Sequence, residues 1–79
     1  MKIEVSQDDI KYGRRRSTGY CPIALATQRT TGEKWIVGSN MMWKQDSPQG
    51  DNLYFAPEVE LFIRNFDAGE PVAPFSFEV

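Results

Sequence analysis

The sequence predicts an α+β fold, in which a small, mostly antiparallel sheet carries helices packed on one face. Three observations point to it: short segments where apolar and charged residues alternate, one segment with an apolar stripe at helical spacing, and turn-forming residues between them. A chain of 79 residues has the size of one domain. We therefore expect a single domain over residues 1–79, with the element order β-α-α-β-(β)-α-β.

A strand and a helical turn are expected at the start of the chain. Ile3 and Val5 alternate with charged neighbours, as they would in a half-buried strand. Ser6 and Asp9 have the spacing of a capping box, in which the two side chains satisfy free N–H groups at the start of a helix. The helical turn is expected to end at Gly13.

A helix and a hairpin are expected next. Residues 22–30 begin with a proline, which the first turn of a helix tolerates, and continue with good helix formers. Gly32 follows where a left-handed residue commonly ends a helix. Residues 35–37 and 41–43 have strand character and flank the turn formers at 38–40, so they predict a β-hairpin. A single bulged strand is the alternative.

The remaining segments predict a loop, a helix and a strand. Residues 44–52 are polar and are expected to form a solvated loop. Pro57 and Gly69 bracket a helix whose apolar residues recur at i, i+3, i+4 and i+7. These residues are Val59, Phe62, Ile63 and Phe66. Alternating residues in 75–79 predict a last strand, which we expect to pair with the first one.

Charge is distributed unevenly along the chain. The whole sequence holds 9 basic and 11 acidic residues, for a net charge of −2. Residues 1–36 hold seven basic and four acidic residues, a balance of +3, whereas residues 37–79 hold two and seven, a balance of −5. This asymmetry indicates either a polarised surface that meets a charged partner or two halves that attract each other in the fold.

The composition excludes several classes of function. The sequence has no histidine, which removes histidine-based acid/base catalysis, histidine-activated nucleophiles and the commonest metal ligand. Its single cysteine cannot complete a thiolate zinc site or an internal disulfide. We therefore expect no enzymatic activity and no cofactor. No apolar run approaches the roughly 20 residues of a membrane span, and no signal-peptide pattern follows Met1. We expect no membrane association and a cytoplasmic location.

The arginine loop, residues 14–19, is the first candidate site. Its members predicted to bind an anion or a partner are Arg14, Arg15, Arg16, Ser17 and Thr18. Arginine pairs bidentately with phosphate or carboxylate, and the loop precedes a helix N-terminus whose free N–H groups favour anions. The alternative is a solvated loop that balances the acidic second half of the chain.

Exposed aromatic residues are the second candidate site. A domain of this size cannot bury all ten aromatic side chains, and Trp and Tyr are frequent among interface hot spots. We predict that the exposed members of Met42, Trp43 and Tyr54 form a docking patch for a partner. The alternative is that they close the core, as we expect Trp35 to do. We interpret Cys21 as a small buried residue, the alternative being a reactive thiol.

Two segments resemble a family of short phage and prophage-encoded proteins of unknown function. They are C-P-I-A-L-A at residues 21–26 and F-D-A-G-E-P-V-A-P-F-S-F-E at residues 66–78. Residues 1–29 and 53–79 fit the pattern of the family. The resemblance implies a phage origin and a related fold, and it carries over no catalytic residue.

Together these features predict a non-enzymatic, phage-encoded protein that binds a host protein or complex stoichiometrically in the cytoplasm of a bacterial cell. An inhibitor of host defence, such as an anti-CRISPR protein, is the specific form of this hypothesis. The alternative is a module that binds a phosphate ligand or nucleic acid through the arginine loop. A homodimer is compatible with both, because a short sheet leaves an exposed edge.

Overall fold

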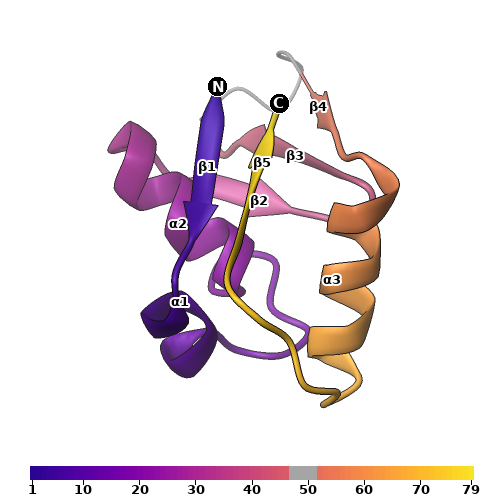
Figure 1. Cartoon of the computed structure of the whole chain (residues 1–79). Coiled ribbons are helices and arrows are strands. Elements are labelled where there is room, and N and C mark those ends of the chain that lie inside the picture. The colour runs from indigo at the N-terminus through magenta and orange to yellow at the C-terminus, as the bar shows by residue number, and fades with distance from the viewer. Residues whose placement is uncertain (47–51) are drawn as a thin grey trace.

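The computed structural model describes residues 1–46 and 52–79 and confirms the predicted α+β fold (Figure 1). Within these residues the chain forms five strands and three helices. In order they are β1 (Lys2–Val5), α1 (Gln7–Tyr12), α2 (Pro22–Thr31), β2 (Trp35–Val37), β3 (Met41–Lys44), β4 (Leu53–Tyr54), α3 (Pro57–Asp67) and β5 (Phe75–Glu78). The order matches the prediction except for β4, which is too short to leave an alternating pattern in the sequence.

The strands form two antiparallel sheets instead of the single sheet that we expected. β1 pairs with β5, as predicted, and places Ile3 opposite Phe77 and Val5 opposite Phe75. The two chain ends therefore lie side by side (Figure 1). β2, β3 and β4 form the second sheet in that order. Alternation along a strand identifies its buried face but not its neighbour, so the number of sheets could not be predicted.

The hairpin expected over residues 35–43 is confirmed. Its facing pairs are Trp35 with Lys44, Ile36 with Trp43, and Val37 with Met42. The N–H of Gly38 donates to the carbonyl of Met41 at 2.7 Å and closes the turn. Lys44 belongs to β3, so the polar loop predicted over residues 44–52 begins later. Residues 47–51 of that loop lie outside the described residues.

The predicted helix ends are confirmed by local geometry. Both bonds of the capping box between Ser6 and Asp9 are present at the start of α1. Gly32 ends α2 with a φ of 74°, in the left-handed conformation that glycine adopts without strain. Gly69 follows α3 with a φ of 81°. Among the helices of the described residues, none combines the length and apolar character needed to cross a bilayer.

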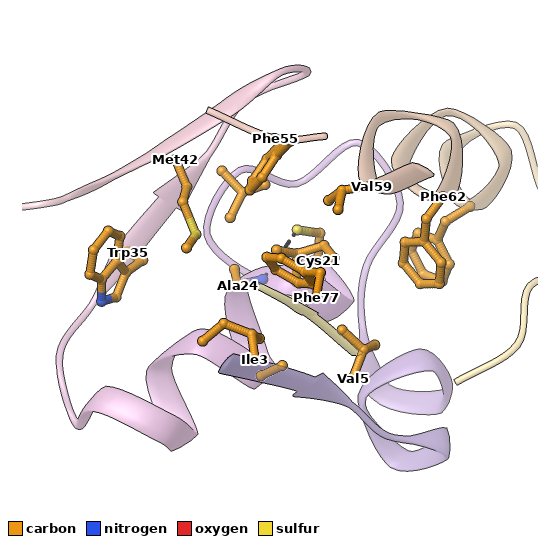
Figure 2. Packing of buried hydrophobic residues seen from close by; sticks show 14 residues of the cluster. Ile3, Val5, Cys21, Ala24, Trp35, Met42, Phe55, Val59, Phe62 and Phe77 are labelled. Carbon is orange, nitrogen blue, oxygen red and sulfur yellow. Dashed lines mark hydrogen bonds between the residues drawn. The ribbon is translucent and has the colours of Figure 1, made fainter. Parts of the chain in front are cut away.

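The core lies between the two sheets and is closed by α2 and α3. Figure 2 shows Ile3 and Val5 of β1 pointing into the same interior as Met42 of β3 and Val59 of α3. These four side chains are at most 1% exposed. Helix α2 packs on both β1 and β2, so it connects the two sheets across one shared core.

Phenylalanine side chains join the C-terminal half of the chain to this core. The ring centroids of Phe62 in α3 and Phe75 in β5 lie 4.6 Å apart. Phe75 stacks on Phe77 at 5.6 Å, and Phe77 meets Phe55 edge to face at 5.9 Å. Each such aromatic pair contributes about 1 kcal/mol beyond the area that it buries. The chain of contacts holds α3 against the β1–β5 sheet.

An ion pair between buried Asp9 and exposed Arg29 joins α1 to α2. Asp9 is only 4% exposed, and its carboxylate accepts hydrogen bonds from both ends of the Arg29 guanidinium, one of them from Nη2 at 2.9 Å. Nη2 of Arg29 also donates to the carbonyl of Glu4 at 2.9 Å. Burial by itself raises the pKa of Asp9, but the hydrogen bonds from Arg29 and Ser6 outweigh it and hold the pKa below its usual range. Asp9 is therefore more than the helix-start charge that we expected.

Candidate functional site

The three-stranded sheet turns one face to the core and the other face away from it. Trp35 and Met42 are buried and point inward from β2 and β3 (Figure 2). Because successive side chains of a strand point to opposite faces, the residues beside them project from the outer face. Two facing pairs of apolar side chains stand on that face. We call them the outer apolar surface: Ile36 opposite Trp43, and Met41 opposite Tyr54.

Helix α2 covers the inner face of this sheet. Nε1 of Trp35 donates to Oγ1 of Thr31 at 3.0 Å, and Oγ1 of Thr27 contacts Sδ of Met42 at 3.6 Å. On the outer face, Tyr54 is 66% exposed, and its three apolar neighbours are half-buried. The outer apolar surface is therefore a partly solvated sheet face with aromatic side chains.

Met42 does not belong to a docking patch, so that part of the prediction is wrong. Its side chain is fully buried, because the alternation along β3 turns it to the face opposite Met41 and Trp43. The sequence analysis missed Met41 and Ile36, which stand beside the predicted Trp43 and Tyr54. The available signal was the alternation within residues 41–43, which assigns the first and third residues to one face.

Trp43 is held in place by the turn of the hairpin. A Cβ atom placed on Gly38 would lie 3.5 Å from the indole ring, so the ring rests directly on the glycine backbone. A side chain that is already ordered loses little conformational entropy when a partner covers it. Trp43 thus has the properties of a preorganised aromatic anchor, with the more exposed Tyr54 nearby on the same face.

The three consecutive arginines diverge. The guanidinium of Arg14 lies over the ring of Tyr20, with its Cζ 5.4 Å from the ring centroid. Arg15 lies against Gly69, where an added Cβ would approach its Cζ to 3.4 Å. Arg16 adopts a φ of 57° and donates its backbone N–H to Oδ1 of Asp67 at 2.8 Å. The three residues therefore contact different parts of the fold.

The rest of the arginine loop supports the fold. Oγ of Ser17 accepts a hydrogen bond from the N–H of Tyr20 at 3.1 Å, and the carbonyl of Thr18 accepts one from Val37 at 2.8 Å, along the free edge of β2. At the start of α2, the N–H of Ala24 donates to Sγ of buried Cys21. One free N–H of this helix N-terminus is therefore satisfied within the chain. Anion or partner binding by the loop residues stays a prediction.

Cys21 is buried, as the structural interpretation of this residue predicted. It is 6% exposed, and burial raises the pKa of its thiol, so the thiol stays protonated at neutral pH. A small cavity of about 180 Å³ reaches it between the arginine loop, the β2–β3 turn and α3. Nothing in this arrangement activates the sulfur as a nucleophile.

A larger groove continues from this cavity along α3. It has a volume of about 430 Å³ and is lined by four charged side chains, together with Ser39, Ile63 and Ala68. The charged side chains are Arg16, Glu60, Arg64 and Asp67. Two cations and two anions in one groove give no net charge, so the lining favours no ligand of a single sign.

No protein-family model, curated protein or solved structure matches the chain. The resemblance of residues 21–26 and 66–78 to short phage proteins therefore stays a prediction. The outer apolar surface is the described feature that best matches the chemistry of a binding site, because it gathers aromatic and aliphatic side chains on one face.

Proposed function

We propose that this protein is a non-enzymatic binding protein that docks on another protein through the outer apolar surface. The observation that carries the proposal is the pair of cross-strand contacts, Ile36 with Trp43 and Met41 with Tyr54, on the face of the sheet that the core does not use. Covering apolar surface contributes about 25 cal/mol per Å². Tyr and Trp are also the residue types that most often dominate binding energy.

The shape of the surface favours a protein partner over a small ligand. Small molecules bind in concave pockets that enclose most of their surface, whereas a sheet face is flat. The two cavities beside Arg16 are lined largely by charged and polar side chains, and neither includes a residue of the outer apolar surface. A flat aromatic and aliphatic patch matches the core of a protein interface.

The chemistry of the chain supports stoichiometric action. The sequence has no histidine, and its one thiol is buried with a raised pKa. Such a protein acts by occupying a target, so its effect should saturate at one copy for each target site.

The finer proposal concerns the partner and its location. The resemblance to phage-encoded proteins supports a host protein or complex in the bacterial cytoplasm, and a defence complex such as a CRISPR effector is the specific case. In that case, expression of the protein should restore plaque formation on a host whose CRISPR system targets the phage. Loss of this effect in Tyr54→Ala would connect it to the outer apolar surface.

Two exposed tyrosines supply a matched test of the docking surface. Tyr54 is 66% exposed within the surface, and Tyr12 is 67% exposed outside it. A protein captured from host lysate by the wild-type chain is purified and titrated against the wild type, Tyr54→Ala and Tyr12→Ala by calorimetry. We expect saturable binding, with an affinity that falls by about 30-fold in Tyr54→Ala and less than about twofold in Tyr12→Ala.

Three outcomes would contradict the proposal. One is a captured protein whose affinity is the same for the wild type and Tyr54→Ala. Another is light scattering that shows a stable dimer of this chain, broken by Tyr54→Ala, because the surface would then be occupied by a second copy. The third is conversion of a substrate with turnover by the purified protein.

A further inference from the structure

A second surface, rich in unpaired cations, lies where α1 ends. Lys11, Arg14 and Lys34 are exposed, and no carboxylate of residues 1–46 or 52–79 comes within 4.0 Å of their charged nitrogens. Arg29 and Lys44, by contrast, form ion pairs with acidic side chains. The positive charge of the first half of the chain is therefore only partly neutralised inside the fold.

Two exposed tyrosines stand among these cations. Nζ of Lys11 lies 5.3 Å from the ring centroid of Tyr12. Tyr20 lies close to both Arg14 and Lys34, whose cationic groups are 5.4 Å and 4.5 Å from its ring centroid. We call these five residues the basic aromatic surface. Tyr12 is 67% exposed and Tyr20 is 48% exposed, so both side chains reach solvent beside the cations that lie over their rings.

The backbone brings these residues together from three parts of the chain. The N–H of Arg14 donates to the carbonyl of Tyr20 at 2.8 Å, which closes the arginine loop and places the end of α1 beside the start of α2. Lys34 arrives from the segment before β2, and its Nζ donates to the hydroxyl of Tyr20 at 3.3 Å. Four of the five residues lie within residues 11–20 of the sequence, and Lys34 lies 14 positions beyond Tyr20.

We propose that the basic aromatic surface binds single-stranded nucleic acid. Bases stack on exposed aromatic rings whatever their identity, and neighbouring lysine and arginine side chains neutralise the phosphates that connect the bases. Paired bases in a duplex are already stacked on each other and present only edges and phosphates, so a surface that combines tyrosine side chains with cations favours an unpaired strand.

The surface fits an acidic protein less well than it fits a nucleic acid. Two of its three cations are lysines, Lys11 and Lys34, and lysine is depleted from protein interfaces. Seven of the eleven acidic residues lie in the second half of the sequence, and among the described residues none of them forms an ion pair with Lys11, Arg14 or Lys34. At physiological salt, charges act over about 8 Å, so the local balance decides.

The proposal is tested with fluorescently labelled 12-nucleotide oligo-dT and oligo-U, with a blunt DNA duplex and inorganic polyphosphate as competitors. Fluorescence anisotropy measures the dissociation constant from 50 to 200 mM salt. With about three phosphate contacts, log affinity should fall with log salt at a slope near −2. Both single strands should bind more tightly than the duplex does. The DNA and RNA arms identify the preferred strand.

Single substitutions separate stacking from charge. Tyr12→Ala should weaken oligonucleotide binding by about fivefold to 30-fold, and Tyr12→Phe, which keeps the ring, should restore it. Arg14→Gln should reduce the salt slope by about 0.7. Tyr54→Ala is the matched control with an equally exposed tyrosine, and it should bind like the wild type. Circular dichroism melts confirm that each variant is folded.

Four results would overturn the proposal. The first is the absence of saturable binding at 50 mM salt, and the second is equal affinity for the duplex and the single strands. The third is displacement of the oligonucleotide by polyphosphate together with unchanged binding in Tyr12→Ala. The fourth is stronger binding to poly-glutamate than to either oligonucleotide. The last result would assign the surface to an acidic polypeptide. Each outcome is independent of the docking role of the outer apolar surface, because the two surfaces share no residue.

Discussion

The outer apolar surface and the basic aromatic surface each present an exposed tyrosine, yet they offer different chemistry. Tyr54 and Tyr12 are 66% and 67% exposed. Tyr54 stands opposite Met41 in a sheet whose backbone ladder fixes the neighbouring apolar side chains. Tyr12 stands beside Lys11, at the end of a short helix with further cations nearby. Exposure alone therefore does not identify a binding mode; the neighbouring side chains determine what each ring can recognise.

The largest expected change in stability distinguishes the core face of the three-stranded sheet from the face that we propose binds a partner. Met42→Ala should lower the free energy of unfolding by about 3 kcal/mol, because it removes a fully buried side chain and leaves a cavity. Met41→Ala, one residue earlier, should lower the free energy of unfolding by less than about 1 kcal/mol and should instead weaken binding of the captured partner. Urea unfolding and calorimetric titration measure the two effects. Similar losses of stability in both variants would mean that Met41 is also a core residue.

Loss of the ion pair between Asp9 and Arg29 should lower the stability of the protein and affect the two surfaces differently. Asp9→Asn removes the negative charge that pairs with Arg29 and stabilises the N-terminus of α1. It should lower the free energy of unfolding by about 2 kcal/mol. Asp8→Asn is the control in the same helical turn, where Asp8 is exposed, and it should cost less than about 0.5 kcal/mol. Because Asp9 secures α1, its loss should also weaken oligonucleotide binding at Tyr12 and leave the outer apolar surface intact. Equal stability of the two variants would contradict this role.

The same pair predicts how stability depends on acid. The pKa of Asp9 is lower in the folded protein than in the unfolded chain, so its contribution is fully present above the ordinary carboxyl pKa. The contribution is lost as the pH falls through the lower, folded value. Asp9→Asn should therefore flatten the acid limb of a plot of unfolding free energy against pH. An unchanged acid limb would show that other carboxylates control it.

Raising the salt concentration should weaken oligonucleotide binding by about 1.6 kcal/mol and should leave partner docking nearly unchanged. Between 50 and 200 mM salt, a slope near −2 corresponds to a roughly 16-fold loss of oligonucleotide affinity. Docking through the outer apolar surface should change by less than about twofold, because apolar burial involves no released counterions. Calorimetry and anisotropy on the same preparation make the comparison direct. A steep salt dependence of both modes would remove the distinction between the surfaces.

The smallest effects concern the stability of the two tyrosine variants. Both side chains are mostly in water, so Tyr54→Ala and Tyr12→Ala should each change the free energy of unfolding by less than about 0.5 kcal/mol. Thermal melts followed by circular dichroism measure the change. A loss of more than about 1 kcal/mol of unfolding free energy in one variant would show that this tyrosine ring supports the fold. The effect of that variant on binding would then be compared with the effect of the corresponding Tyr→Phe variant.

The parts of the fold that could be predicted are those with local signals. The capping box at Ser6, the left-handed Gly32 and the stripe that includes Val59 and Phe62 each involve residues a few positions apart, and the structure confirms all of them. Such signals depend on backbone geometry within one or two turns. They need no knowledge of what lies on the other side of the molecule.

The candidate sites were predicted less completely, because they depend on distant contacts. Trp43 and Tyr54 were identified by residue type, but Met42, the third residue considered, is buried, and Ile36 was missed. The face on which each of these side chains lies follows from the pairing of β3 with its neighbours. A shift of that register by one residue would move every side chain to the opposite face. Lys34 could not be placed beside Tyr20 from its position in the chain.

By itself, the sequence determined the types and order of the main elements and the absence of imidazole from any possible chemistry. Only the tertiary structure decided that the strands divide into two sheets, that Arg29 reaches Asp9, and that the three arginines diverge. The physical reason is range. Propensity, capping and turn geometry act between near neighbours in the chain, whereas strand partners, ion pairs and surfaces depend on how distant segments pack together.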